Sequence, residues 1–276
     1  MEYAILFLPL IGALLGYVIK VFGDIYSEIV TTLFVSAAAI LSIILFYNGI
    51  VYEDYGNYKI YQWIASGKFV VNASINIDPL SSIMLVVVSL VSALVHIYSI
   101  GYMSHDPDKP RFMCYLSLFT FAMFTLVVSD NFLQLFFGWE GVGLCSYLLI
   151  GFWHKKNSAN NAAIKAFIVN RIGDFGFAIG IFLIFIFFGT LNYEEVFTLA
   201  PNFANTEINF LGLKVNLITV TCLFLFIGAM GKSAQFFFTH MATRRNGRTY
   251  TSISFNSCCN NGYCRCFFSS QMFTNF

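Results

Sequence analysis

The sequence predicts an all-α, polytopic transmembrane helix bundle. Apolar side chains make up 58% of the residues and charged ones only 11%, whereas soluble domains carry about 25% charged residues. The apolar residues also gather in runs close to the ~20 residues that a helix needs to cross a bilayer. The net charge of +1 gives no sign of a nucleic-acid partner. The lipid bilayer is therefore the surrounding that we expect for most of this chain.

We expect about seven spans. They are Tyr3–Val21, Val30–Ile50, Leu80–Met103, Phe112–Val128, Phe132–Phe152, Ala163–Gly189 and Val215–Phe236. The first lacks a basic start and its apolar run is too long for a signal peptide, so we expect a retained helix. In the connection Val51–Pro79, apolar residues alternate around Val71–Ile77. That alternation predicts a short β-hairpin lying on one membrane face.

The placement of Lys and Arg predicts the orientation. With the amino terminus outside, five basic residues fall at inner loops and span ends and three fall in outer loops. The inner set is Lys20, Lys109, Arg111, Lys155 and Lys156, and the outer set is Lys59, Lys68 and Lys214. We expect a multi-pass protein of a bacterial plasma membrane, with the mitochondrial inner membrane as the alternative.

Glu140 lies near the middle of the apolar segment Asn131–Phe152, within GWEGVG. A carboxyl group there costs roughly 2.5–3.5 kcal/mol on insertion scales, and such groups often mark proton or ion routes. Small neighbours allow close helix packing. Burial favours the neutral acid while a nearby cation favours the carboxylate, which would make a switchable proton site. The alternative is a structural Glu140 bonded to a polar partner.

Two further apolar segments contain charges. Arg171 and Asp174 are three residues apart in AAIKAFIVNRIGDFGFAIG, so they could pair along one helix face. Such a pair could relay charge or could only ease insertion. Lys165 lies nearer the predicted inner end and could simply extend to the interface. Lys232, in FIGAMGKSAQF, follows Gly231, which suggests a loosened helix that lines a cavity; a terminal lysine that reaches the interface is the alternative.

Cys258, Cys259, Cys264 and Cys266 form CCNNGYCRC near the end of the chain. Their spacing does not match a standard zinc pattern, and no neighbouring histidine completes one. The chain also lacks the motifs of nucleotide, haem and iron–sulfur sites. We therefore expect neither a metal nor a redox cofactor in this chain.

Four strings together resemble one family. They are DPLSSIMLVVVSLVSALVHIYSIGYMSHDPDKPRF, DNFLQLFFGWEGVGLCSYLLIGFW, NAAIKAFIVNRIGDFGFAIGI and FIGAMGKSAQF. The family is subunit L, or mitochondrial subunit 5, of the proton-translocating NADH–quinone oxidoreductase called respiratory complex I. The resemblance covers about residues 1–236.

The resemblance implies roles for the charged residues. Glu140 corresponds to a glutamate of the family's fifth helix, and Lys232 to its electrostatic partner on a broken seventh helix. Asp174 corresponds to an aspartate facing an adjacent antiporter-like subunit, and Lys165 and Arg171 to basic positions of the same helix. Together they would form a proton relay driven by quinone reduction elsewhere.

The resemblance also implies an organisation and partners. Residues 1–60 would form N-terminal helices, 61–111 the family's N-terminal-type region, and 112–236 the start of an antiporter-type domain. Other membrane subunits of the complex would be the partners, and NADH, FMN, iron–sulfur clusters and quinone would bind to other subunits. Two alternatives stay open: a large subunit of a multisubunit cation/proton antiporter, and a non-functional membrane fragment.

The tail, residues 237–276, departs from the family. A one-base shift of the reading frame converts Thr239–Thr243 (THMAT) into HTWLP, with which the family continues. We interpret the tail as the product of a frame slip near Phe236–Phe238 that truncates the subunit. On this interpretation the cysteine cluster is not a functional site, and the tail is disordered.

Overall fold

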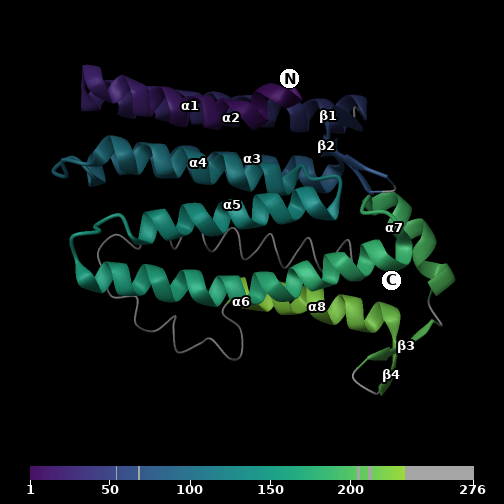
Figure 1. Ribbon diagram of the computed structural model, residues 1–276. Coiled ribbons are helices and arrows are strands. Elements are labelled where there is room, and N and C mark those ends of the chain that lie inside the picture. The colour runs from purple at the N-terminus through teal and green to yellow at the C-terminus, as the bar shows by residue number, and fades with distance from the viewer. Residues whose placement is uncertain (54, 68, 204–205, 211–212, 234–276) are drawn as a thin grey trace.

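The computed structural model describes residues 1–233, except residues 54, 68, 204–205 and 211–212 (Figure 1). The predicted frame slip, the tail with its cysteine cluster, and the last residues of the seventh predicted span lie outside the described residues. The described part is a bundle of long helices that run roughly parallel or antiparallel, with two small β-hairpins at one end.

Six helices are long and apolar enough to cross a membrane. They are α1 (Glu2–Ile19), α2 (Asp24–Tyr52), α3 (Pro79–Tyr102), α4 (Lys109–Val127), α5 (Phe132–Ile150) and α6 (Asn157–Phe188). The short helix η1 (Lys20–Phe22) extends α1. These helices confirm the first six predicted spans. The seventh corresponds to α8 (Leu217–Ser233), an apolar helix whose described part is shorter than the others.

The predicted hairpin is confirmed, and a second one accompanies it. Strands β1 (Gly56–Ser66) and β2 (Phe69–Ile77) pair antiparallel around Gly67, whose φ of +58° suits a glycine in a tight turn. After α6 the chain forms α7 (Tyr193–Leu199) and η2 (Ala200–Phe203). Strands β3 (Glu207–Phe210) and β4 (Leu213–Asn216) follow and pair antiparallel. Both hairpins and α7 lie at the same end of the bundle (Figure 1).

The β1–β2 hairpin is fastened to the turn between α4 and α5. Ser74 exchanges two backbone hydrogen bonds with the amide of Gln134, at 2.7 and 3.1 Å, and its hydroxyl donates to Asp130 at 3.0 Å. Asn131 donates to the carbonyl of Asn72 at 2.8 Å and also caps the first turn of α5. These bonds hold the hairpin firmly against the end of the bundle.

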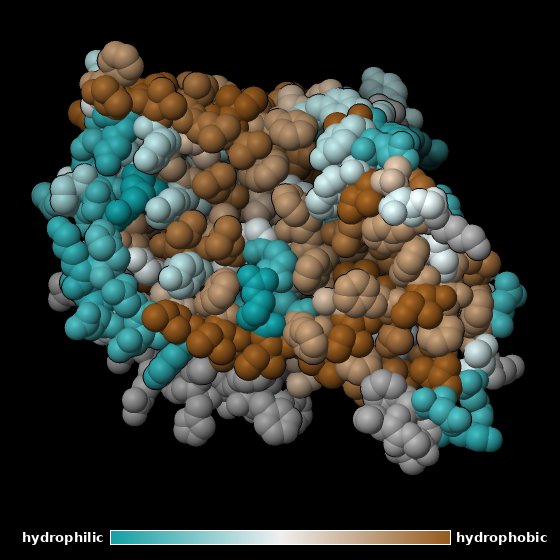
Figure 2. Space-filling view, in the orientation of Figure 1, coloured by the Kyte–Doolittle hydropathy of each residue, from teal (hydrophilic) through white to brown (hydrophobic). Residues whose placement is uncertain are grey.

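Helix α4 lies at the centre of the bundle, since 78% of its 18-residue apolar stretch is buried, whereas the same fraction is 33% for α1. The outward faces of the other helices carry large apolar side chains, such as Leu14, Ile40 and Phe175, which are at least 60% exposed. Figure 2 shows such residues over much of one face. Apolar surface of this extent is what a helix presents to lipid.

The connections α1–α2, α3–α4 and α5–α6 lie at the end opposite the hairpins (Figure 1). The structure therefore confirms that the basic residues Lys20, Lys109, Arg111, Lys155 and Lys156 share one end of the bundle. We call it the basic end. That the basic end faces the cell interior stays a prediction.

Candidate functional site

Glu140 and Arg171 form an ion pair between α5 and α6. A guanidinium nitrogen of Arg171 donates to the carboxylate of Glu140. The side chain of Glu140 is 21% exposed and that of Arg171 is 49% exposed. The guanidinium also lies 4.9 Å from the ring centroid of Phe167, at cation–π distance. The structure thus joins two charged groups on neighbouring apolar helices, near the middle of α5.

Asp174 has a different partner from the one that its spacing suggested. The sequence allowed a pair between Arg171 and Asp174, but in the described residues Arg171 pairs with Glu140. Asp174 is 3% exposed and accepts a hydrogen bond of 2.6 Å from the indole nitrogen of Trp139. Both side chains of α6 find their partners on α5, and an i,i+3 rule for one helix does not take such partners into account.

Lys232 approaches the same place from α8. Its ammonium donates to the backbone carbonyl of Trp139 and lies 4.2 Å from the centroid of that indole ring. Lys232 also interacts electrostatically with Asp174. Lys232 therefore contacts Trp139, the residue before Glu140, and its expected partnership with Glu140 stays a prediction. Trp139 touches Asp174 with its indole and Lys232 with its carbonyl and ring.

Glycines bring α6 and α8 close enough to place Lys232. A Cβ added to Gly173 would lie 2.9 Å from the Cα of Gly231, and one added to Gly228 would lie 2.6 Å from the Cβ of Phe177. Phe177 stacks on Trp139 with an interplanar angle of 5°. Close backbone approach through small residues is the usual way in which membrane helices associate. The contact therefore sets the position of the lysine relative to Trp139.

Lys165 is not part of this cluster. It is exposed on α6, six residues before Arg171 and nearer the basic end. Its position fits the alternative that a long side chain extends to the interface. The structure brings Glu140, Arg171, Asp174 and Lys232 together around Trp139, which we call the charged cluster.

Sequence reasoning missed Trp139 as the centre of the cluster, because an uncharged aromatic residue in an apolar segment gives no sign of such a site. It also missed His96 in α3, which is fully buried. The ring nitrogens of His96 bond the carbonyl of Ser92 at 2.8 Å and the hydroxyl of Ser117 at 3.0 Å. The signal was a histidine inside an apolar segment with a serine four residues earlier.

A second buried pair lies near the basic end. The ammonium of Lys109 is 3.4 Å from the carboxylate of Glu28, whose side chain is 7% exposed. The predicted second span began at Val30, whereas α2 begins at Asp24, so Glu28 fell outside the predicted membrane segment. Among the described residues, no three His, Cys, Asp or Glu side chains are grouped so that they could hold a metal ion.

Two family profiles match the chain. The one described as "NADH:quinone oxidoreductase/Mrp antiporter, TM" matches residues 129–241. The one described as "NADH-Ubiquinone oxidoreductase (complex I), chain 5 N-terminus" matches residues 63–113.

Two solved structures share the fold. A chain of the archaeal membrane-bound sulfane sulfur reductase superposes with a TM-score of 0.76 at 17% identity, covering 99% of this chain and 40% of that one. A chain of the Mrp complex from Dietzia sp. DQ12-45-1b gives 0.65 at 19% identity, covering 86% and 24%. Fold and charged cluster together define an antiporter-like membrane subunit.

Curated relatives narrow the class. NADH-quinone oxidoreductase subunit L of Rickettsia bellii is 51% identical over 232 residues, which are 84% of this chain and 36% of the relative. NADH-ubiquinone oxidoreductase chain 5 of Chondrus crispus is 49% identical over 236 residues, 85% of this chain and 35% of the relative. The chain belongs to this subunit L, or chain 5, family and spans about a third of the length of the curated relatives that it matches.

Proposed function

We propose that this chain is a proton-translocating, membrane-arm subunit of an NADH–quinone oxidoreductase. The observation that carries the proposal is the charged cluster: four ionisable side chains from α5, α6 and α8 meet around Trp139 within apolar helices. Ionisable groups at membrane depth are costly and usually mark proton or ion routes. The family relationship supplies the coupled reaction, which is quinone reduction in other subunits.

Glu140 is the proton-accepting group in this mechanism, and Arg171 is its switch. The guanidinium of Arg171 contacts the carboxylate of Glu140, so movement of Arg171 toward or away from Glu140 changes the charge that the carboxylate faces. Lys232 and Asp174 influence the same step through Trp139, because each of them contacts that residue. The proposal therefore adds a path through Trp139 to the expected partnership of Lys232 with Glu140.

The partners of the chain are proposed to be other membrane subunits, including an adjacent antiporter-like one. The half-exposed side chain of Arg171 supports a neighbour at this position, because a lipid-facing guanidinium is costly. NADH, FMN, iron–sulfur clusters and quinone would bind elsewhere in the complex. A bacterial plasma membrane is proposed as the location, and relatives from Rickettsia bellii and Rhodobacter capsulatus support it.

A large subunit of a multisubunit cation/proton antiporter is the second candidate. The family description that matches residues 129–241 names both kinds of protein, and the Mrp complex shares the fold. The two candidates differ in what drives proton movement: NADH oxidation in one, a cation gradient in the other.

The test begins with assembly. The tagged chain is expressed with all the other subunits of a related complex, including those that oxidise NADH, and co-purification is measured together with proton uptake by inverted vesicles. We expect uptake that depends on NADH. Uptake that depends on a sodium gradient instead would favour the antiporter, and a chain that neither assembles nor conducts would be an inert fragment.

The role of Glu140 is tested in a full-length relative, at the glutamate aligned with it. Replacement by glutamine removes the ionisable proton while keeping the shape of the side chain. We expect several-fold slower proton pumping in an assembled complex. The matched control is the aligned equivalent of Glu53→Gln, since Glu53 is exposed at the hairpin end. Unchanged pumping in the Glu140 variant would remove that residue from the mechanism.

A further inference from the structure

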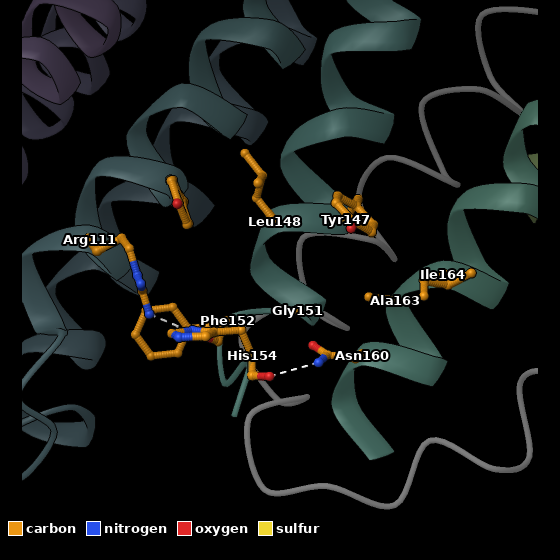
Figure 3. A pocket seen from close by; sticks show the side chains of 10 residues that line it. Arg111, Tyr147, Leu148, Gly151, Phe152, His154, Asn160, Ala163 and Ile164 are labelled. Atoms are coloured by element: carbon orange, nitrogen blue, oxygen red, sulfur yellow. Dashed lines mark hydrogen bonds between the residues drawn. The ribbon is translucent and has the colours of Figure 1, made fainter. Parts of the chain in front are cut away.

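A cavity of about 480 Å³ opens at the basic end, between α4, α5 and α6 (Figure 3). It lies apart from the charged cluster, since Tyr147 on its wall is seven residues, or about 10 Å along the helix, from Glu140. Its walls combine apolar and aromatic side chains with a few polar groups. The lining includes Arg111, Tyr147, Leu148, Phe152, His154 and Ile164.

Arg111 provides the polar side of the cavity. Its Nη2 donates to Asp108 at 3.1 Å and to the carbonyl of Phe152 at 3.1 Å. Its Nε is buried and has no hydrogen-bond partner within the described part of the chain. The side chain of Arg111 as a whole is 26% exposed and lines the cavity, so its guanidinium can reach an oxygen-rich anion there.

The charges around the mouth favour an anion. His154, Lys155 and Lys156 are exposed in the connection between α5 and α6. The helices α4 and α6 both begin at this end, and their amino termini carry partial positive charge. Two carboxylates oppose this: Asp108 pairs with Arg111, and Asp106 accepts from Trp153 at 2.8 Å. Lysines 155 and 156 have no acidic partner of this kind among the described residues.

The remaining wall suits an acyl chain. Ile164 lines the cavity and is 48% exposed, and Ile168, one turn deeper along α6, is 53% exposed. An exposed apolar strip of α6 therefore leads from the cavity toward the middle of that helix. The mouth of the cavity lies where the helices end, which is the depth of lipid headgroups. A free phosphate would use only the polar side, whereas a phospholipid would use both.

We propose that this cavity binds an acidic phospholipid, with its phosphate at Arg111 and one acyl chain along Ile164 and Ile168. Basic pockets between helices at the membrane surface are suited to such headgroups. The guanidinium of Arg111 donates to a phosphate oxygen, and Lys155 and Lys156 add the long-range attraction. The site concerns lipid recognition and is independent of proton translocation.

The test uses the 276-residue chain, purified in detergent and stripped of lipid. Phosphatidylglycerol or phosphatidylcholine with the same acyl chains is titrated in, and bound lipid is counted by native mass spectrometry. We expect about tenfold tighter binding of phosphatidylglycerol, because both lipids carry the phosphate but the quaternary ammonium of phosphatidylcholine is repelled by Arg111, Lys155 and Lys156. Arg111→Gln and the cavity-filling Ala163→Leu should each remove most of that preference. Lys214→Gln, an exposed change at the hairpin end, should leave it intact.

Thermal unfolding of each variant separates loss of binding from loss of fold; if Arg111→Gln unfolds, Ala163→Leu decides. Equal retention of the two lipids would overturn the proposal, as would a folded deciding variant that keeps its preference for phosphatidylglycerol. An excess of inorganic phosphate distinguishes the two sources of the anion. Failure of phosphate to displace the lipid supports a lipid site, and full displacement would overturn that assignment.

Discussion

The indole nitrogen of Trp139 donates a hydrogen bond of 2.6 Å to the carboxylate of Asp174. This bond joins α5 to α6 one residue away from the Glu140–Arg171 ion pair. The same tryptophan receives the ammonium of Lys232 on its backbone carbonyl. One residue thus ties three helices together at the point where their charges meet.

Trp139→Phe should destabilise the chain by about 1.5–3 kcal/mol, the range for a hydrogen bond to a charged group. The substitution keeps a ring that can stack on Phe177 but leaves Asp174 without the indole donor. Unfolding in detergent measures the change. Trp153→Phe is the control, because its bond to Asp106 is only part-buried. Equal losses of unfolding free energy in both variants would show that the bond to Asp174 stabilises the chain no more than the bond to Asp106 does.

Glu140→Gln and Arg171→Gln should each lower the free energy of unfolding by more than the double variant Glu140→Gln/Arg171→Gln does. A single change leaves one charge without its partner among apolar side chains, and the double change removes both charges. We expect a coupling energy between the ~0.5 kcal/mol of an exposed pair and the ~3 kcal/mol of a buried one. A double-mutant cycle of unfolding free energies measures it. Strictly additive losses would contradict the pair.

The sequence predicted which residues form this site, but not the contacts that they make between different helices. Charges inside apolar runs identified Glu140, Arg171, Asp174 and Lys232 without any coordinates. Their pairing depends on how α5, α6 and α8 pack, which the spacing within one helix does not contain. For that reason the sequence suggested a pair between Arg171 and Asp174, whereas the structure pairs Arg171 with Glu140. The roles of these residues stay a prediction.

The elements of the fold that were predicted are likewise those with a local sequence pattern. Length and hydropathy predicted the six spans, and alternation predicted the β1–β2 hairpin, because both patterns are local. The second hairpin escaped prediction because β3 and β4 are only four residues each. Glu28 escaped because an apolar run gives the core of a helix but not its first turn.

Gly173→Ala should separate α6 from α8 at the position of Lys232. The added Cβ would lie 2.9 Å from the Cα of Gly231, and backbone atoms cannot give way as a flexible side chain does. We expect a cost of about 1–3 kcal/mol, typical of overpacking. Gly143→Ala is the matched control, because within the described part of the chain no atom beyond its neighbours and its own helix turn lies within 4 Å of the added Cβ. Comparable unfolding curves for the two variants would contradict the close approach.

Ionisation of Tyr193 should make the chain less stable above about pH 10, which is the ordinary pKa of tyrosine. Burial raises the pKa of Tyr193, and the nearby Asp130 raises it further, against the lowering effect of the bond to Ser129. The unfolded chain then loses this proton at lower pH than the folded chain does. The contribution is complete below pH ~10 and is lost as the pH rises.

Unfolding of the wild type and of Tyr193→Phe is compared between pH 8 and pH 11, a range chosen around the ordinary tyrosine pKa of about 10. Tyr193→Phe should show the smaller loss. Tyr52→Phe, a change at an exposed position, controls for removal of a hydroxyl. If the free energy of unfolding fell with pH equally in the wild type and in Tyr193→Phe, Tyr193 would not be the cause of the loss of stability.

The attachment of the β1–β2 hairpin to the α4–α5 turn has a consequence for biosynthesis. A ribosome releases Ser74 well before Asp130 and Gln134, the residues that later bond to it. The hairpin is therefore made before its docking surface exists. Two more helices must insert before the hairpin can settle, so the order of insertion governs when this end of the subunit becomes resistant to proteases.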